Sequence, residues 1–192
     1  MFYTSLILIF NKKQILVFVP RLVSILFVFF QLLGMLVYPG GTIHDISTNG
    51  YSFTSNFFSD MGAYAARNGE PNYLSMIFFS LSLTLVGVTF ALYYLVLPKI
   101  MGSDNLNYIL SWIGTFFAFC GSICLIGTGL TPTDLVFDAH VFFANNIFHS
   151  FLITAFCYSI AIFRSEVLDK LYAMGYVLFF ISIFIYVGVL QF

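Results

Sequence analysis

The chain alternates long apolar stretches with short polar connections. A membrane-spanning helix needs about 20 mostly apolar residues, and five stretches meet this requirement. The predicted spans are residues 17–38, 73–97, 107–130, 139–163 and 171–191. The pattern therefore predicts an all-α, polytopic transmembrane helix bundle that forms a single domain over residues 1–192.

The N-terminal residues raise the question of a sixth span. The apolar run from Met1 to Phe10 is too short to cross a bilayer, and Asn11-Lys12-Lys13 interrupts it. We expect an interfacial helix there, or an extension of the first span with a kink near Pro20. A sixth span would require residues 1–18 to supply it.

The longest connection, residues 39–72, has a pattern of its own. Capping residues such as Asn56 precede Phe57 and Phe58, and Asn68-Gly69 provides a stop signal. This pattern predicts a short helix near residues 56–67 that lies at the membrane interface with its aromatic face toward the lipid.

Composition supports the membrane assignment. Sixty per cent of the residues are hydrophobic and only 8% are charged, whereas a soluble domain has about 25% charged residues. The net charge of −1 and the lack of a basic patch argue against nucleic acid as a partner, because phosphate binding requires clustered cations. The expected partners are membrane lipid and other membrane proteins.

The distribution of cations predicts an orientation. Arg67 is the one cation on the same side as the 39–72 loop, and the other six Lys and Arg residues lie on the opposite side. Because cations favour the cytoplasm, we expect a cytoplasmic N-terminus and an outer loop at 39–72. With five spans the C-terminus is outside, and the expected location is the plasma or inner membrane.

The same assignment places most of the ionisable groups on the outer side. Thr131-Pro132 has the form of a helix start, and Asp134, three residues after Thr131, is predicted to cap that helix.

Cys120, Cys124 and Cys157 lie within apolar runs and are interpreted as buried, small apolar side chains.

A polar stripe is predicted along the fourth span. At about 100° per residue, Asp138, Asn145 and His149 share one face, while His140 points elsewhere. A polar side chain deep in a span should face the interior of the helix bundle or a cavity. The sequence therefore predicts an outward-facing polar pocket, formed by Ser59, Asp60, Asp134, Asp138, His140, Asn145 and His149.

Two segments together resemble a known family. "NFFSDMGAYAARNGEPN" and "GTGLTPTDLVFDAH" are similar to elements of the bacterial and archaeal membrane proteins catalogued as domain of unknown function 998. The matching positions are Asn56, Ser59, Asp60, Gly62, Gly129, Pro132, Asp134 and His140. The resemblance implies a helical membrane bundle, often of six spans, and implies no reaction.

Three functions remain open at this stage. The first is a non-catalytic accessory, lipid-binding or partner-binding helix bundle, favoured because no catalytic signature such as H-E-x-x-H or a P-loop occurs. The second is an intramembrane, metal-dependent lipid hydrolase with zinc held by His44, Asp60 and His149. Its candidate catalytic residues are Ser59, Asp60, Asp138 and His149, with Asp138 as the base or as a support for the imidazole. The third is a small proton-coupled transporter that uses Asp138 and His149 as a relay.

Overall fold

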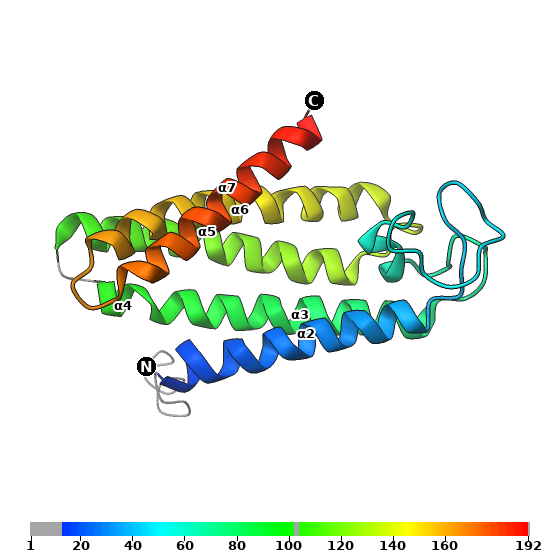
Figure 1. Cartoon of the computed structure of the whole chain (residues 1–192), viewed down its shortest axis with the longest axis horizontal. Coiled ribbons are helices and arrows are strands. Elements are labelled where there is room, and N and C mark those ends of the chain that lie inside the picture. The colour runs from blue at the N-terminus through cyan, green and yellow to red at the C-terminus, as the bar shows by residue number, and fades with distance from the viewer. Residues whose placement is uncertain (1–12, 102–103, 192) are drawn as a thin grey trace. The chain divides into compact units, whose positions relative to one another are not determined.

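The structure is a computed structural model that describes residues 13–101 and 104–191. Within these ranges the chain is helical, with two isolated antiparallel bridges, Gly40 to Asn49 and Ala65 to Pro71, and no β-strand. The elements are the π-helical turn η1 (Gln14–Phe18), α2 (Val19–Leu36), the 3-10 helix η2 (Phe58–Gly62), α3 (Tyr73–Val96), α4 (Pro98–Met101), α5 (Asn105–Leu130), α6 (Phe137–Arg164) and α7 (Lys170–Gln191). Figure 1 labels the α-helices.

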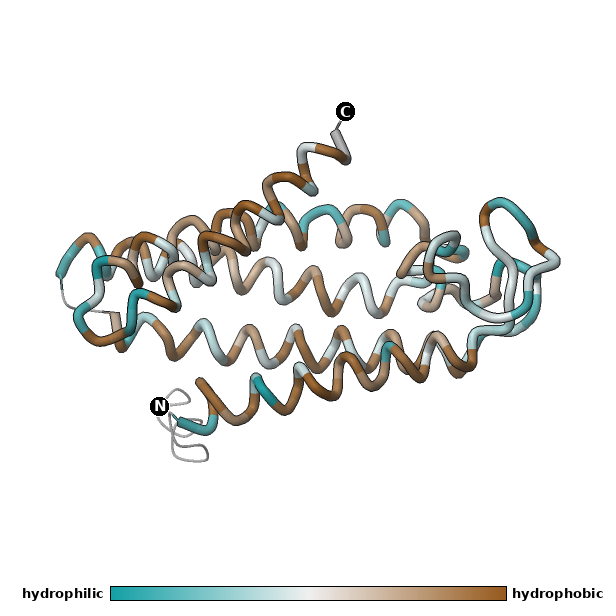
Figure 2. The backbone as a smooth tube through the Cα atoms, viewed as in Figure 1, coloured by the Kyte–Doolittle hydropathy of each residue, from teal (hydrophilic) through white to brown (hydrophobic). Residues whose placement is uncertain are grey.

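Five of the described helical stretches are long and apolar enough to cross a membrane. They are Gln14–Leu36, Tyr73–Met101, Asn105–Leu130, Phe137–Arg164 and Lys170–Val189. Figure 2 shows apolar residues along these helices and hydrophilic residues mainly in the connections. The predicted all-α, multi-pass membrane fold is confirmed. The suggested contribution of residues 1–12 to a sixth span lies outside the described residues.

The chain divides into two compact units, and the boundaries fall inside α2, α3, α5 and α6. The first unit, called the α7 unit here, comprises residues up to Pro20, Thr89–Ile123 and Asn145–Phe192. The second, called the loop unit, comprises Arg21–Val88 and Cys124–Ala144. Each unit is described separately below.

In the loop unit, α2 packs on the first half of α3 through apolar contacts and one buried polar contact. Phe30 stacks on Phe78 with ring centroids 6.0 Å apart, and Gln31 donates a hydrogen bond to the Ser82 hydroxyl. Gly62 lies directly against the Phe79 ring, where an added Cβ would come within 2.5 Å of a ring carbon. This close approach seats η2 on α3.

In the α7 unit, buried hydroxyl groups join four helices. The Thr115 hydroxyl donates to the Tyr94 carbonyl at 2.9 Å and lies 2.8 Å from the Tyr158 hydroxyl. The Tyr176 hydroxyl of α7 bonds to the Tyr94 hydroxyl at 3.1 Å. A polar group in an apolar span is costly unless it is hydrogen-bonded, so these bonds specify how α3, α5, α6 and α7 meet in this unit.

The 37–72 segment between α2 and α3 differs from its prediction. The expected helix over 56–67 is reduced to the five residues of η2, Phe58–Gly62. After Gly62 the backbone is extended, with Ala63 at φ −73° and ψ 150°. The helix cannot continue because the amides of Tyr64 and Ala65 donate to the Asp134 carboxylate instead of to helical carbonyls.

Candidate functional site

Asp60 is the centre of the polar cluster in the loop unit. Its side chain is 3% exposed, and its Oδ1 accepts hydrogen bonds from Arg67 Nε at 3.0 Å and Arg67 Nη2 at 2.8 Å. The Arg67 side chain is 41% exposed, so the guanidinium lies with one edge on the carboxylate and the other toward solvent. The hydrogen bond to Asp60 raises the pKa of Arg67 above its ordinary value.

The second oxygen of Asp60 binds the loop itself. Oδ2 accepts from Asn56 Nδ2 and from the Phe57 amide, each at 3.0 Å. Asn56 also donates to the Gly41 carbonyl at 2.9 Å and accepts from the Ser52 amide. Four hydrogen bonds therefore occupy the Asp60 carboxylate, which explains how a charged group is tolerated in a buried position.

Asn72 closes the same loop from the side of α3. Its Nδ2 lies within hydrogen-bond distance of three backbone carbonyls, those of Asp60, Met61 and Ala63, at 3.3, 3.1 and 2.9 Å. The side chain is 1% exposed. Because the residues around η2 leave carbonyl groups without helical partners, Asn72 is required to satisfy them.

Asp134 has a different role from the predicted one. Its two oxygens accept from the amides of Tyr64 at 2.8 Å and Ala65 at 2.9 Å, and α6 begins only at Phe137. The prediction that Asp134 caps a helix starting at Thr131 is therefore wrong. The carboxylate instead anchors the 131–136 connection to the 37–72 segment.

A small cavity of about 270 Å³ lies between these two anchored segments. Its polar lining includes Asp60, Arg67 and Asp134, and its apolar lining includes Phe137. Tyr38 forms another wall, and its hydroxyl accepts from the Arg67 amide at 3.0 Å. Burial raises the pKa of this phenol above its ordinary value. The structure thus brings Asp60 and Asp134 to one cavity, as the sequence predicted.

Two other predicted residues also lie in the loop unit. His140 is 4% exposed, and its Nδ1 lies 2.7 Å from the Thr131 carbonyl. Since a carbonyl only accepts, Nδ1 is the protonated ring nitrogen. Ser59 is half-buried in η2 and does not line the cavity. His140 therefore holds the connection before α6 through its hydrogen bond to Thr131. Neither His140 nor Ser59 lines the cavity that contains Asp60.

The remaining members of the predicted stripe are placed otherwise than expected. Asp138 of the loop unit is exposed, and so are Asn145 and His149 of the α7 unit. The prediction that Asn145 and His149 face the interior is wrong for a single chain. Their common helical face was inferred from periodicity, but periodicity does not say which face the neighbouring helices cover.

The predicted metal ligands do not come together in the described part of the chain. His44 is exposed in the turn after Gly41, and the Asp60 oxygens already have the partners given above. No group of three or more His, Cys, Asp or Glu side chains placed to hold a metal occurs among residues 13–101 and 104–191.

Several residues of the cluster were not singled out from the sequence. Arg67 and Asn72 hydrogen-bond to Asp60, through its carboxylate and its carbonyl respectively, and the Tyr38 hydroxyl accepts from the Arg67 amide. One signal was available for Arg67, since it is the single cation among the acids of the 37–72 segment and a buried carboxylate requires a partner. Tyr38 and Asn72 had no such signal.

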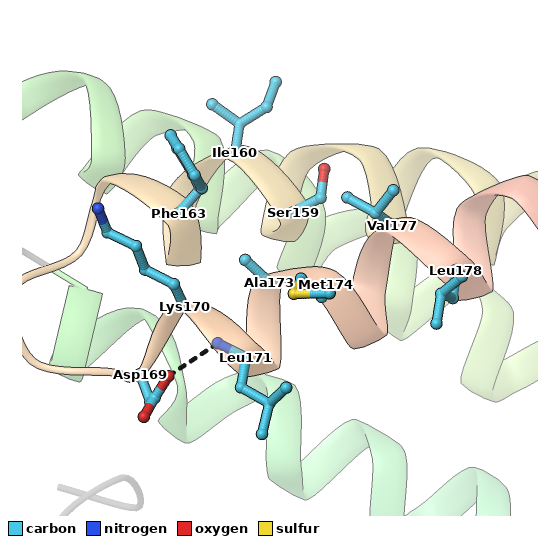
Figure 3. Close-up of a pocket in the computed structure, with 10 residues that line it drawn as sticks. All are labelled: Ser159, Ile160, Phe163, Asp169, Lys170, Leu171, Ala173, Met174, Val177 and Leu178. Atoms are coloured by element: carbon cyan, nitrogen blue, oxygen red, sulfur yellow. Dashed lines mark hydrogen bonds between the residues drawn. The ribbon is translucent and has the colours of Figure 1, made fainter.

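A larger cavity lies in the α7 unit, between the end of α6 and the start of α7. Its volume is about 770 Å³, within the range of about 300–1,000 Å³ that is usual for ligand pockets. Figure 3 shows the lining residues, which are Ser159, Ile160, Phe163, Asp169, Lys170, Leu171, Ala173, Met174, Val177 and Leu178. We call this cavity the α6–α7 groove.

The two charged residues of the α6–α7 groove are adjacent in the chain. Lys170 Nζ lies 5.2 Å from the centroid of the Phe163 ring, a cation–π distance. Asp169 Oδ1 accepts from the Leu171 amide at 2.8 Å and so caps the first turn of α7. The groove therefore combines a long apolar wall with one cation and one anion at the start of α7 (Figure 3).

A second polar cluster joins α5 to the end of α6. Arg164 donates from Nε to Asn107 Oδ1 at 3.0 Å and from Nη2 to Asp104 Oδ2 at 2.9 Å. The hydrogen bond from the Asn107 amide, followed by that from Arg164, holds the pKa of Asp104 below its ordinary value. Asp104 therefore caps the start of α5, and Arg164 joins this helix end to α6.

Comparison of the chain with known proteins found no matching family model, no matching curated protein and no matching solved structure. The function is therefore argued from the geometry of the described residues.

Proposed function

We propose that this protein is a non-catalytic, multi-pass membrane protein that binds a phospholipid in the α6–α7 groove. The observation that supports the proposal is the groove itself, an apolar cavity of about 770 Å³ with Asp169 and Lys170 in its lining. It is formed by two helices that are long and apolar enough to span a membrane.

An acyl chain fits the apolar part of the groove. Ile160, Met174 and Val177 present carbon and sulfur surface to the cavity. Water gains no hydrogen bonds from such a wall, whereas an acyl chain that enters it from the bilayer exchanges one apolar environment for another and packs against the side chains. The bilayer supplies acyl chains at high local concentration, so a hydrocarbon tail is the occupant that this surface favours.

The charged residues of the groove fit a zwitterionic headgroup. The Lys170 ammonium is suited to the lipid phosphate, since lysine binds phosphate as a point charge. The Asp169 carboxylate suits a primary ammonium, which donates hydrogen bonds, better than a quaternary one, which donates none. The pair therefore favours phosphatidylethanolamine over phosphatidylcholine or an anionic phospholipid.

The polar cluster of the loop unit supports a non-catalytic role. The carboxylates of Asp60 and Asp134 are bound by the chain's own amides and guanidinium. A general base or a metal ligand needs a free lone pair directed at its substrate or metal. The arrangement found here instead holds the 37–72 segment in one conformation.

The orientation and the membrane are part of the same proposal. The connection 97–104 contains Lys99, and the connection 165–169 is flanked by Arg164 and Lys170. Cations favour the cytoplasm. This places the N-terminus in the cytoplasm, the 37–72 segment outside and Lys170 at the inner headgroup layer of the plasma or inner membrane. The resemblance to domain of unknown function 998 implies a helical membrane bundle, often with one span more than the five of this topology.

Native mass spectrometry of the purified protein tests the proposal. The full chain is titrated with phosphatidylethanolamine, phosphatidylcholine and phosphatidylglycerol of identical acyl chains. We expect the tightest binding for phosphatidylethanolamine. Lys170→Gln should weaken binding of all three lipids, and Asp169→Asn should remove the preference for phosphatidylethanolamine while keeping the cap on α7, since Asn also caps helices.

Matched variants separate the groove from general lipid contact. Val177→Trp fills the groove, whereas Val189→Trp adds the same bulk to an exposed position of α7 outside it. We expect only Val177→Trp to reduce the number of retained lipids. Equal retention by both variants, or equal affinity for all three lipids in the wild type and in Lys170→Gln, contradicts the proposal.

A further inference from the structure

The exposed polar face of α6 in the α7 unit lies at membrane depth. Helix α6 has 28 residues and is about 42 Å long at 1.5 Å per residue, while the hydrocarbon core is about 30 Å thick. His149 is the thirteenth residue of this helix, close to its midpoint, and Asn145 lies one turn before it. Both therefore fall within the hydrocarbon layer.

Neither side chain finds a hydrogen-bond partner in the described part of the chain. Both are exposed, and the structure gives neither side chain a hydrogen bond to any other described residue. Helix α7 contacts α6 through Phe148 against Tyr186, with ring centroids 4.3 Å apart, and through Phe156 against Phe180. Lipid tails offer no hydrogen-bond partner, so an amide and an imidazole facing them would be left unpaired.

The spacing of this face matches a helix–helix seam. Asn145, His149 and Leu152 follow one another at intervals of four and three residues, as the a and d positions of a heptad do. Phe156, four residues further, packs on Phe180 of α7 with ring centroids 5.8 Å apart and ends the seam. Between Ala139 and Phe163 the sequence contains no Asp, Glu, Lys or Arg. The seam therefore carries hydrogen-bonding groups and apolar groups, without a carboxylate, ammonium or guanidinium that would need an opposite charge.

We propose that this face of α6 pairs with the same face of a second copy of the chain. Two copies in one membrane have the same orientation, so a twofold axis along the membrane normal makes the two helices parallel. Asn145 then meets Asn145 of the second copy, and His149 meets its own counterpart. A carboxamide and a neutral imidazole each have a donor and an acceptor, so both residues are self-complementary.

Subunit counting in liposomes tests this pairing. Fluorescently labelled full-length protein is reconstituted over a range of protein-to-lipid ratios, and the monomer–dimer equilibrium is measured by single-molecule photobleaching. We expect a dimer for the wild type and about a tenfold weaker association for Asn145→Leu/His149→Leu. A loss of about 1.4 kcal/mol corresponds to this factor, within the range for a few interhelical hydrogen bonds in a membrane. Ser182→Ala, which removes an exposed hydroxyl of α7 bonded to its own helix, should leave the equilibrium unchanged.

Site-directed crosslinking gives a second readout that does not depend on removing the polar groups. With Cys120 replaced by Ser, a cysteine at Leu152 should form an intermolecular disulfide, whereas one at Phe119, exposed on α5, should not. A monomer at every protein-to-lipid ratio overturns the proposal. A dimer that is unaffected by the double substitution, or crosslinks at Phe119 rather than Leu152, overturns it as well, because the contact then lies elsewhere.

Discussion

Asp60 in the loop unit and His149 in the α7 unit are both ionisable side chains, but they differ in burial and in hydrogen bonding. Asp60 is 2% exposed and its carboxylate accepts four hydrogen bonds. His149 is exposed in the middle of an apolar helix, without a side-chain hydrogen bond to the described residues. The first group finds its hydrogen-bond partners among the described residues of one chain, and the second finds none among them.

The comparison separates structural polarity from polarity available for binding. A buried charge persists only when its partners are present, so the well-satisfied Asp60 cluster indicates stability rather than chemistry. Unsatisfied groups at membrane depth indicate an interface or a ligand. By this criterion the α6 face and the α6–α7 groove, rather than the Asp60 cluster, are the places to search for function.

The largest effect is expected from Asp60→Ala. The substitution leaves the Phe57 amide, the Asn56 side chain and the Arg67 guanidinium without their acceptor. Loss of hydrogen bonds to a charged group, reduced because Arg67 can turn to solvent, should lower the free energy of unfolding by about 3 kcal/mol. Denaturant titration in detergent measures it. Asp45→Asn, an exposed acid in the same segment, is the control and should have little effect.

The Asp134 anchor should show a smaller and more local effect. Asp134→Ala removes the acceptor of the Tyr64 and Ala65 amides, at a cost of about 1–2 kcal/mol because the site is exposed. Hydrogen exchange should become faster at these two amides. Asp138→Ala, four residues along and exposed, should leave their protection unchanged, and equal effects of the two substitutions would argue against the anchor.

Substitution of His149 by leucine tests whether this side chain of the α6 face is exposed in the monomer. His149→Leu should change the stability of the monomer by less than about 0.5 kcal/mol, because it replaces an exposed group by one that lipid favours. Thr154→Leu, at a fully buried position bonded to the Gly114 carbonyl, should be strongly destabilising. A large loss of thermal stability for His149→Leu in dilute detergent would show that the histidine is buried after all.

The smallest effect concerns pH and the exposed cluster at Arg164. Asp104 has a folded-state pKa below its ordinary value of 3.8. Its unfolded form therefore binds the proton first as the pH falls, and the stability that it contributes is present above about 3.8 and is lost as the pH falls through the folded pKa. Denaturation midpoints of wild type and Asp104→Asn should converge at acidic pH. A difference that is constant over this pH range would contradict the prediction.

The positions of the spans and of one anchoring acid were predictable. Five apolar runs of sufficient length specify five helices, since the bilayer allows few other structures for them. Asp60 was singled out as an acid on the predicted outer side and as a position of the segment that resembles a known family. Tyr38 and Asn72 were not, because their hydrogen bonds, from the Arg67 amide and to the Ala63 carbonyl, involve backbone groups and leave no trace in residue pattern.

The sequence by itself determined the fold class, the five spans and the shared helical face of Asn145 and His149, because these depend on length, hydropathy and a fixed turn per residue. Only the tertiary structure decided that η2 ends at Gly62, that Asp134 binds the Tyr64 and Ala65 amides, and that the α6 face is exposed. These features depend on which distant groups meet, and local periodicity contains no information about the neighbours of a face.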